Sequence, residues 1–167
     1  MSSNATTLEN LQTALEMEMT AAHQYQLHAH VLDDWGLDKL ASRMRDEMQE
    51  EMGHLDQFIG RLLFLDAEPK VKMAKSPDRA KSLKALFEAD LGDEKEAIRF
   101  YSKAAQDAAE EGDIGSRALF EGIVMDEEGH MDWLRTQLDL IERIGEQNYA
   151  AKFMSSKGSD GGDAAGA

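Results

Sequence analysis

The chain has 167 residues, a length that suits one domain with a full hydrophobic core. It contains no cysteine, which excludes disulfides, thiolate zinc sites and iron–sulfur clusters. Its net charge of −15 argues against nucleic acid as a partner, and the lack of a long apolar run or a signal sequence predicts no membrane contact and a cytoplasmic location.

Four long helices and a short fifth are predicted from apolar residues that recur three and four positions apart. The expected ranges are 6–34, 38–65, 82–111, 114–143 and, for the short helix, 146–154. Thr6 and Glu9 have the spacing of a capping box at the start of the first helix. The only prolines, Pro69 and Pro77, lie in the stretch 66–81. This stretch is too long for a tight turn, so we expect it to cross over along the bundle.

The expected fold class is therefore all-α, a four-helix bundle with a long connection between its second and third helices. Residues 1–154 are expected to form this single domain. The tail, residues 155–167, consists of Gly, Ser, Asp, Ala and Lys, and it is expected to be disordered.

A Glu-x-x-His pair occurs twice in the chain, with the two copies 76 residues apart. Three residues of helix turn through about 300°, so the Glu and His of each copy stand side by side on one face. The same offset relates further residues, which indicates two divergent half-repeats. The related pairs are Glu51 and Glu127, His54 and His130, Glu18 and Glu94, and Tyr25 and Tyr101.

Each of the four glutamates interrupts an apolar helix face at mid-height. Buried carboxylates that lie close together cannot all ionise unless positive charge lies between them. Two divalent cations would cancel four negative charges, and no Arg or Lys is expected at that level. Carboxylates combined with imidazoles favour iron, manganese or zinc. Two helices with one Glu each and two with Glu-x-x-His form the ligand set of a dinuclear site in a four-helix bundle.

The alternative, that these glutamates form a solvated outer face, suits any one of them taken alone. It does not explain why all four fall in register with apolar faces. The remaining histidines lie about 80° to 140° around the first helix from Glu18, and they are interpreted as surface or subunit-contact residues. They are His23, His28 and His30.

Several segments carry a resemblance to a known family, and together they span nearly all of residues 8–150. They are HQYQLHA at 23–29 with Glu18 before it, WGL at 35–37, the stretch 46–56 around Glu51-Met52-Gly53-His54, RLLFL at 61–65, DEEGHMDWL at 126–134 and QNY at 147–149. In these segments the chain resembles the bacterioferritins, within the ferritin-like superfamily.

The resemblance implies a ferritin-like bundle whose dinuclear site binds two iron ions per subunit. Glu18 and His54 would bind one iron, Glu94 and His130 the other, and Glu51 and Glu127 would bridge them. The family oxidises Fe(II) with dioxygen or hydrogen peroxide and stores the product as a mineral inside a shell of 24 subunits built from two-fold dimers. Tyr25 matches a family tyrosine beside the site, where it is either a hydrogen-bond partner, an electron donor or a core filler. No such role is carried to Tyr101.

Met52 matches the family's haem ligand, so the resemblance also implies a b-type haem shared by two subunits. The alternative is that Met44, Met48 and Met52, four residues apart, form an apolar subunit interface. A ferredoxin reductant and a second subunit type in a mixed shell are further partners that the family suggests. Gly53, beside Met52, makes the contacts of the haem propionates hard to predict.

Glu47 is an inward carboxylate without a counterpart, because Ile123 stands 76 residues later. We expect it to pass iron between the dinuclear site and a surface, with Asp46 and Glu50 flanking it. Both flanking residues can equally belong to a solvated acidic face. Bacterioferritins commonly carry a His where this chain has Asp46, which puts an inner-surface iron site of the familiar kind in doubt.

Two other functions stay open at this point. One is a small-oligomer di-iron or di-manganese oxidoreductase of the peroxidase or catalase type. The other is a non-catalytic subunit of a mixed shell, which the complete set of six ligands disfavours. Native mass separates a shell from a small oligomer.

Overall fold

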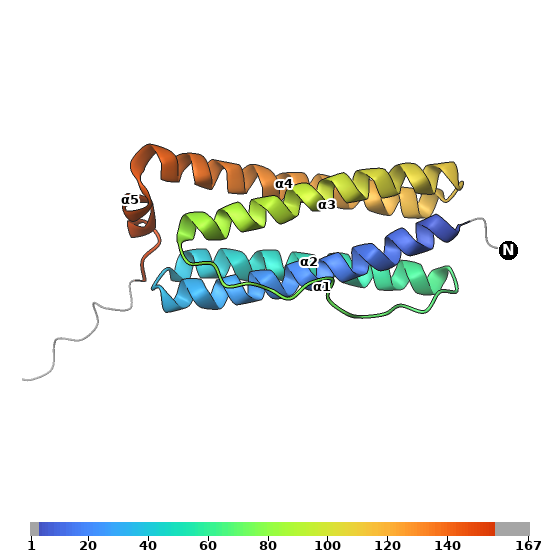
Figure 1. Cartoon of the computed structure of the whole chain (residues 1–167), viewed down its shortest axis with the longest axis horizontal. Coiled ribbons are helices and arrows are strands. Elements are labelled where there is room, and N and C mark those ends of the chain that lie inside the picture. The colour runs from blue at the N-terminus through green and yellow to red at the C-terminus, as the bar shows by residue number, and fades with distance from the viewer. Residues whose placement is uncertain (1–3, 156–167) are drawn as a thin grey trace, which may run out of the picture.

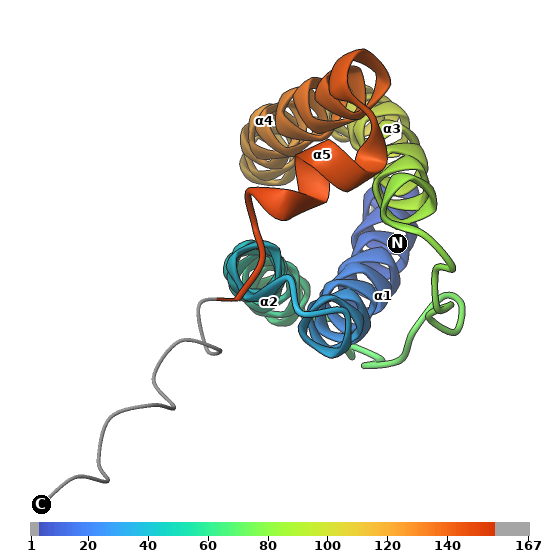
Figure 2. The same cartoon turned by 90° about the vertical axis from the view of Figure 1, so that its left-hand side faces the viewer.

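The structure is a computed structural model that describes residues 4–155. Its helices are α1 (Ala5–Asp34), α2 (Asp38–Phe64), α3 (Leu83–Glu110), α4 (Ile114–Ile144) and α5 (Glu146–Ala151). The pair α1 and α2 lies beside the pair α3 and α4, and α5 covers one end of the bundle (Figures 1 and 2). The predicted all-α bundle with its short fifth helix is confirmed. The predicted tail, apart from Ser155, lies outside the described residues.

Glycines and polar caps set most of the helix ends. Three helices end at glycines with positive φ angles: Gly36 (+77°), Gly112 (+75°) and Gly145 (+80°). Each glycine lies one or two residues after the last residue of its helix, α1, α3 or α4. Glycine enters this left-handed region without steric cost, so these positions terminate the helices. The side chain of Ser82 accepts a hydrogen bond from the N–H of Ala85 at 3.1 Å, which caps α3. These residues hold the helices to lengths that bring their midpoints together.

The predicted capping box at the start of α1 is wrong. Asn4 occupies the cap position, and the N–H groups of Thr6 and Thr7 donate to the carboxylate of Glu111 at 3.1 and 3.0 Å. A carboxylate from the end of α3 thus satisfies the free N–H groups of α1 and complements the positive end of the helix dipole. This partner lies too far along the sequence for a local motif to reveal it.

The bundle interior is apolar toward both ends and polar in the middle. One core cluster, near α5, includes Leu32, Phe87 and Tyr149. The other, near the opposite end, includes Leu15 and Phe120. The polar residues between the clusters are described below, and the two apolar clusters keep water away from them on both sides.

The connection from α2 to α3 runs along the outside of the bundle beside α1 (Figure 1). A polar row on α1, spaced four residues apart, fastens it. The row consists of Gln12, Glu16, Thr20 and Gln24. Lys70 and Asp78 each exchange two hydrogen bonds with a Gln side chain of this row, all at 2.9 Å. Between them, the N–H of Ala74 donates to Glu16 O at 3.2 Å and to Thr20 Oγ1 at 2.9 Å. The predicted crossover is confirmed.

Among residues 4–155, no helix is both long and apolar enough to cross a bilayer.

Candidate metal centre

Six side chains from all four long helices meet at mid-height in the bundle. They fall into two overlapping groups whose ligand atoms lie within 4.8 Å of one another. The groups are Glu18, Glu51, His54 and Glu127, and Glu51, Glu94, Glu127 and His130. Each of the six residues is at most 5% exposed. Glu51 and Glu127 belong to both groups, so they stand where a bridge between two ions would be.

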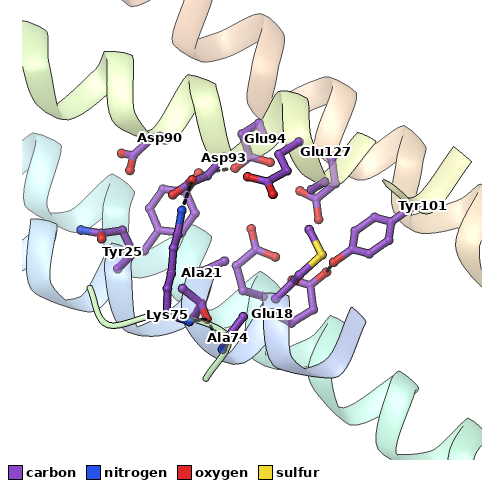
Figure 3. A pocket seen from close by; sticks show the side chains of 16 residues that line it. Glu18, Ala21, Tyr25, Ala74, Lys75, Asp90, Asp93, Glu94, Tyr101 and Glu127 are labelled. Atoms are coloured by element: carbon purple, nitrogen blue, oxygen red, sulfur yellow. Dashed lines mark hydrogen bonds and ion pairs between the residues drawn. The ribbon is translucent and has the colours of Figure 1, made fainter. Parts of the chain in front are cut away.

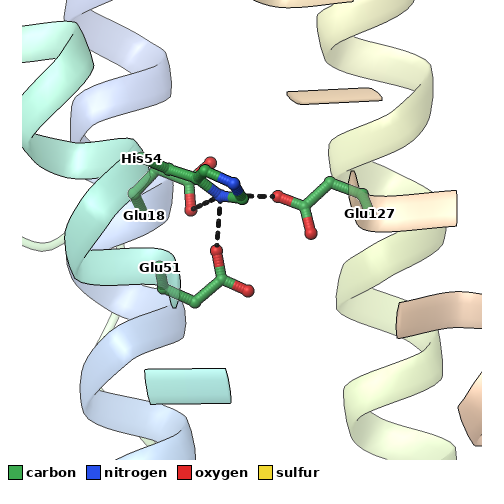
Figure 4. A group of neighbouring side chains, drawn as sticks. All are labelled: Glu18, Glu51, His54 and Glu127. Atoms are coloured by element: carbon green, nitrogen blue, oxygen red, sulfur yellow. Dashed lines mark hydrogen bonds and ion pairs between the residues drawn. The ribbon is translucent and has the colours of Figure 1, made fainter. Parts of the chain in front are cut away.

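The ring of His54 points one nitrogen into the first group (Figure 4). Its Nδ1 atom lies 3.0 Å from Glu51 Oε2, 3.4 Å from Glu127 Oε1 and 3.8 Å from Glu18 Oε2. A single nitrogen thus faces three carboxylates from three helices. This convergence gives one cation an imidazole and carboxylate oxygens within a few ångströms of each other.

His130 repeats the arrangement in the second group. Its Nδ1 atom lies 3.0 Å from Glu127 Oε2, 3.4 Å from Glu51 Oε1 and 3.6 Å from Glu94 Oε1. The two halves therefore match in both residue types and distances, as the 76-residue offset predicts. The structure brings together all six residues expected from the sequence.

The charges at this centre are far from their ordinary balance. Burial first, and the neighbouring Glu51 and Glu127 second, raise the pKa of Glu18 well above its usual value. Burial likewise raises the pKa of Glu94. Burial alone would raise the pKa of Glu51 too, but hydrogen bonds with His130 and His54 lower it to about 2.

The two histidines hold the compensating protons. Burial acts to lower the pKa of His54, but hydrogen bonds to Glu127, Glu18 and Glu51 outweigh it and raise the pKa far above its usual value. His130 behaves in the same way. Without metal, protons on these four groups therefore stand in for positive charge. The four protons, one on each imidazole and one on each of the two carboxylates, add the same positive charge as two divalent cations.

Several buried atoms at the centre lie close to charged neighbours but make no well-directed hydrogen bond within the described part of the chain. They are Glu51 Oε1, Glu127 Oε2, both carboxylate oxygens of Glu47 and both ring nitrogens of His130. Unsatisfied buried polar atoms are costly, so native structures rarely keep them without a role. All of them are atoms of the kind that bind metal ions, and a carboxylate and imidazole set fits iron, manganese or zinc.

A family model described as the ferritin-like domain matches residues 8–144. The bacterioferritin of Rhodobacter capsulatus is 41% identical over 150 residues, covering 90% of this chain and 93% of that protein. Bacterioferritin BfrA of Mycobacterium tuberculosis is 37% identical over 148 residues, covering 89% and 93%. The chain belongs to the bacterioferritins. It is similar to a solved R. capsulatus bacterioferritin with a TM-score of 0.91 and 38% identity, over 95% of this chain and 99% of that one. That structure is described as having a metal-free dinuclear site and a haem iron in a crystallographic special position.

Two tyrosines flank the centre of this bacterioferritin in matching positions. The hydroxyl of Tyr25, on α1, donates to Glu94 on α3, and the hydroxyl of Tyr101, on α3, donates to Glu18 on α1. Both rings are buried, and burial followed by the nearby carboxylates raises both phenol pKa values. Each tyrosine fixes one non-bridging glutamate. Sequence reasoning assigned a role to Tyr25 alone, although the 76-residue offset also marked Tyr101.

The second nitrogen of each histidine faces away from the dinuclear centre. His130 Nε2 lies 2.8 Å from Glu47 Oε2 and 3.2 Å from Glu50 Oε2, and these three residues form a further potential cation group. His54 Nε2 lies 3.2 Å from Asp126 Oδ2. A carboxylate on the outer nitrogen orients a metal-ligating imidazole, so these contacts position both rings. The contact of Asp126 with His54 was not predicted from the sequence.

Asp46, proposed from the sequence to flank Glu47, is exposed and belongs to none of the cation groups found among residues 4–155.

Arg43 is a contact of Glu47 that the sequence did not reveal. Its guanidinium contacts Glu47 one turn along α2 and stacks over the ring of Trp133 at 5.0 Å from the centroid. The Arg43 side chain is partly exposed, but it is long enough to reach the buried carboxylate of Glu47. The spacing of apolar residues along a helix does not reveal such a contact. Glu47 is therefore held between Arg43 and His130.

The interpretation of His28 as a surface residue is wrong. Its side chain is 1% exposed, and its Nδ1 atom lies 2.9 Å from Asp90 Oδ1 on α3. The partner helix and the crossover bury this face of α1, so the angle measured from Glu18 on one helix did not predict exposure. His23 is half-buried and His30 is exposed.

Met52 lies on the outer face of α2 and is 38% exposed, whereas Met44 is fully buried in the core and Met48 packs partly buried against it. The three methionines therefore do not form one exposed stripe. This weakens the interface alternative for Met52 and leaves its thioether free at the surface of the chain.

The metal-free protein is expected to lose stability as the pH rises. His54 and His130 hold protons more tightly in the folded chain than in the unfolded one, so their contribution is complete below the unfolded pKa near 6.5 and falls at higher pH. The raised pKa values of Glu18 and Glu94 act in the same direction. We expect the free energy of unfolding to fall between pH 7 and 8 by about 1.4 kcal/mol per pH unit for each extra proton that the folded chain retains. Thermal melts of chelator-treated protein check this. An apoprotein that is more stable at pH 8 than at pH 6.5 would contradict it.

Proposed function

We propose that this chain is the ferroxidase subunit of an iron-storing shell. The observation that carries the proposal is the pair of overlapping His and carboxylate groups that share Glu51 and Glu127. Iron storage is also what membership of the bacterioferritins implies. Glu18 and His54 would bind one Fe(II), Glu94 and His130 the other, and the shared glutamates would hold the two ions close together.

The reaction requires two electrons, one from each Fe(II). Dioxygen that accepts two electrons and two protons becomes hydrogen peroxide, and hydrogen peroxide that accepts two electrons becomes two hydroxide ions. The buried centre suits this chemistry because two adjacent metal ions deliver both electrons to one oxidant. Binding of the metal releases the protons held by the histidines and by Glu18 and Glu94. Tyr25 and Tyr101 keep the two outer glutamates oriented during this exchange.

The shell is tested by size-exclusion chromatography with metal analysis of protein expressed with added iron. The proposal predicts a peak of several hundred kilodaltons, as 24 subunits of 18.6 kDa require, with far more than two irons per subunit. A small oligomer with about two metals per subunit would overturn storage and favour the di-iron or di-manganese oxidoreductase. A second polypeptide in the peak would show a mixed shell.

We infer that Met52 binds a b-type haem between two subunits, where the haem would supply electrons for release of stored iron. The exposed thioether on the outer face of α2 fits an axial ligand from each of two chains. A haem iron in a crystallographic special position, as in the R. capsulatus protein, is shared equally by symmetry-related chains, which supports the same arrangement here. A ferredoxin is the proposed electron donor.

Met52→Leu is expected to remove the Soret absorbance of the purified shell almost completely, because leucine has no ligand atom. Met125→Leu is the matched control, since Met125 is 71% exposed on α4 and has no proposed role. Absorbance spectra of both variants, normalised to protein, check this. Retention of the Soret band in Met52→Leu would exclude Met52 as the ligand.

We also propose that Glu47 passes iron out of the dinuclear centre, helped by Glu50. Glu47 shares His130 with the centre, since its Oε2 atom lies 2.8 Å from His130 Nε2, and its carboxylate is buried. Asp46 is a weaker candidate, because it takes no part in this contact.

Glu47→Gln is expected to slow growth of the iron core several-fold while leaving the oxidation of the first two Fe(II) ions per subunit nearly unchanged. The charge lost lies beside the centre and not among its six ligands. Asp56→Asn, an exposed position on the same helix, is the control. Core growth is followed by absorbance after repeated Fe(II) additions, and a rate equal to that of the control would remove Glu47 from the route.

A further inference from the structure

A cavity of about 150 Å³ opens between α1, α3 and the crossover and ends at the dinuclear centre. Its inner end is lined by the four glutamates of the centre. Its lining also includes buried Asp90 and the more exposed Asp93 and Lys75 (Figure 3), together with exposed Glu96. Carboxylates therefore follow one another from the surface to the centre. Asp93 at the mouth directly precedes Glu94, one of the proposed ligands.

Among residues 4–155, Lys75 is the only positively charged residue that lines this cavity. Its Nζ atom lies 2.6 Å from Asp93 Oδ1, so the ammonium group reaches from the crossover to α3 across the mouth. The side chains of Lys75 and Asp93 are 57% and 37% exposed, which places the ion pair at the boundary with solvent. The hydrogen bond to Asp93 raises the pKa of Lys75, so this residue carries its charge throughout the neutral range.

The crossover backbone holds Lys75 in place independently of its side chain. The N–H of Lys75 lies 3.4 Å from Thr20 Oγ1, and the N–H of Ala74 donates to the same oxygen at 2.9 Å. Gln24 fastens the backbone again at Asp78. A solvent-exposed ion pair contributes only about 0–1 kcal/mol, so the ammonium group can leave Asp93 while the crossover stays fixed.

We propose that a divalent cation, Fe(II) in the protein's own reaction, reaches the dinuclear centre through this cavity, and that Lys75 acts as a gate at its mouth. The proposal rests on the ferroxidase function given above. An acidic cavity with low-dielectric walls attracts cations. The ammonium group of Lys75 opposes that attraction and occupies Asp93, a carboxylate at the mouth that directly precedes the proposed ligand Glu94. The cation displaces Lys75 from Asp93 and then passes to Glu94 and the bridging glutamates.

The test is the rate at which the metal-free shell takes up Co²⁺, followed by stopped-flow absorbance, which measures loading without oxidation. Lys75→Met is expected to load about three times faster than wild type at low salt, because it removes the opposing charge at the mouth. At about 1 M salt the Debye length falls to about 3 Å, and the difference is expected to shrink toward none. Asp93→Asn is expected to load more slowly than wild type.

Lys72→Met is the matched control. Lys72 lies on the same crossover, pairs with Glu16 at 3.3 Å, and does not line the cavity. Both variants change the net charge equally, so any difference between them reports the position of the charge. Lys75→Met that loads no faster than Lys72→Met would overturn the gate. The endpoint of the same titration tests the centre separately, because a wild-type endpoint other than two Co²⁺ per subunit would overturn the dinuclear site on which the gate depends.

Discussion

Replacing Glu127 with glutamine is expected to slow the rapid oxidation of the first two Fe(II) ions per subunit by about 100-fold or more. Glu127 lies in both potential cation groups, with one oxygen 3.4 Å from His54 Nδ1 and the other 3.0 Å from His130 Nδ1. An amide keeps the shape of the side chain but cannot bridge two cations with two anionic oxygens. Changes in the residues that merely orient metal ligands cost 10- to 100-fold, so loss of a bridging ligand should cost at least as much. Stopped-flow absorbance with two Fe(II) per subunit measures the rate.

Glu128→Gln is the matched control for this variant. Glu128 follows Glu127 on α4 and is exposed, so the same chemical change there should leave the rate unaltered. Unfolding is separated from ligand loss by a thermal melt of both metal-free variants. In the metal-free protein Glu127 faces the rings of both His54 and His130, so metal-free Glu127→Gln is expected to melt somewhat lower than wild type, and the oxidation rates are compared at a temperature at which both variants remain folded. A rapid oxidation phase that survives in Glu127→Gln would exclude Glu127 as a bridge.

Metal binding is expected to stabilise the protein strongly. At a free metal concentration about 1,000 times the dissociation constant, binding to the folded state adds about 4 kcal/mol. For a chain of this size each kcal/mol raises Tm by about 2–4 °C, so Co²⁺ or Zn²⁺ should raise Tm by about 10 °C. The physical reason is that a cation replaces the protons that buried carboxylates and imidazoles hold without it. Differential scanning calorimetry of the chelator-treated and metal-loaded protein measures the shift.

The specificity of this shift distinguishes the centre from general screening of an acidic surface. Mg²⁺ prefers oxygen ligands and retains its water, so at equal concentration it should raise Tm much less than Co²⁺. Glu51→Gln, which lacks the other shared glutamate, should lose most of the Co²⁺ effect. Equal shifts with Mg²⁺ and Co²⁺, or an undiminished Co²⁺ shift in Glu51→Gln, would show that the stabilisation does not come from the dinuclear centre.

The six proposed ligands were predictable because a helix converts sequence spacing into a face. Glu51 and His54, three residues apart, necessarily lie side by side, and the 76-residue offset repeated that pair together with its glutamate and tyrosine partners. Periodicity also showed that these polar residues interrupt apolar faces. Packing of the four helices into a bundle then brings the polar residues of all four apolar faces to the same level.

Contacts that depend on the reach of a side chain or on another helix were not predictable in this way. Arg43 bends along α2 to Glu47, and Asp126 reaches His54 from α4, although neither lies on an apolar face. His28 is buried because α3 supplies Asp90. The start of α1 is capped by Glu111, about a hundred residues further along the chain, and no local signal marks that contact.

The polar row on α1 shows a signal that was present but not recognised. Four polar residues spaced four apart, from Gln12 to Gln24, form a continuous line on one face of a helix. Such a line resembles a solvated face in the sequence. In the structure it binds the backbone of the crossover, which in turn carries Lys75 to the mouth of the cavity. A spacing pattern predicts that residues share a face, and only the packed fold determines what covers that face.

Anomalous diffraction from crystals loaded with Fe(II) without oxidant tests the central claim most directly. We expect two iron peaks per subunit at mid-height of the bundle. One should be bonded to Glu18 and His54, the other to Glu94 and His130, with Glu51 and Glu127 bonded to both. A single peak, or peaks confined to Asp93 and the outer cavity or to Glu47 and Glu50, would contradict a dinuclear ferroxidase centre in this chain.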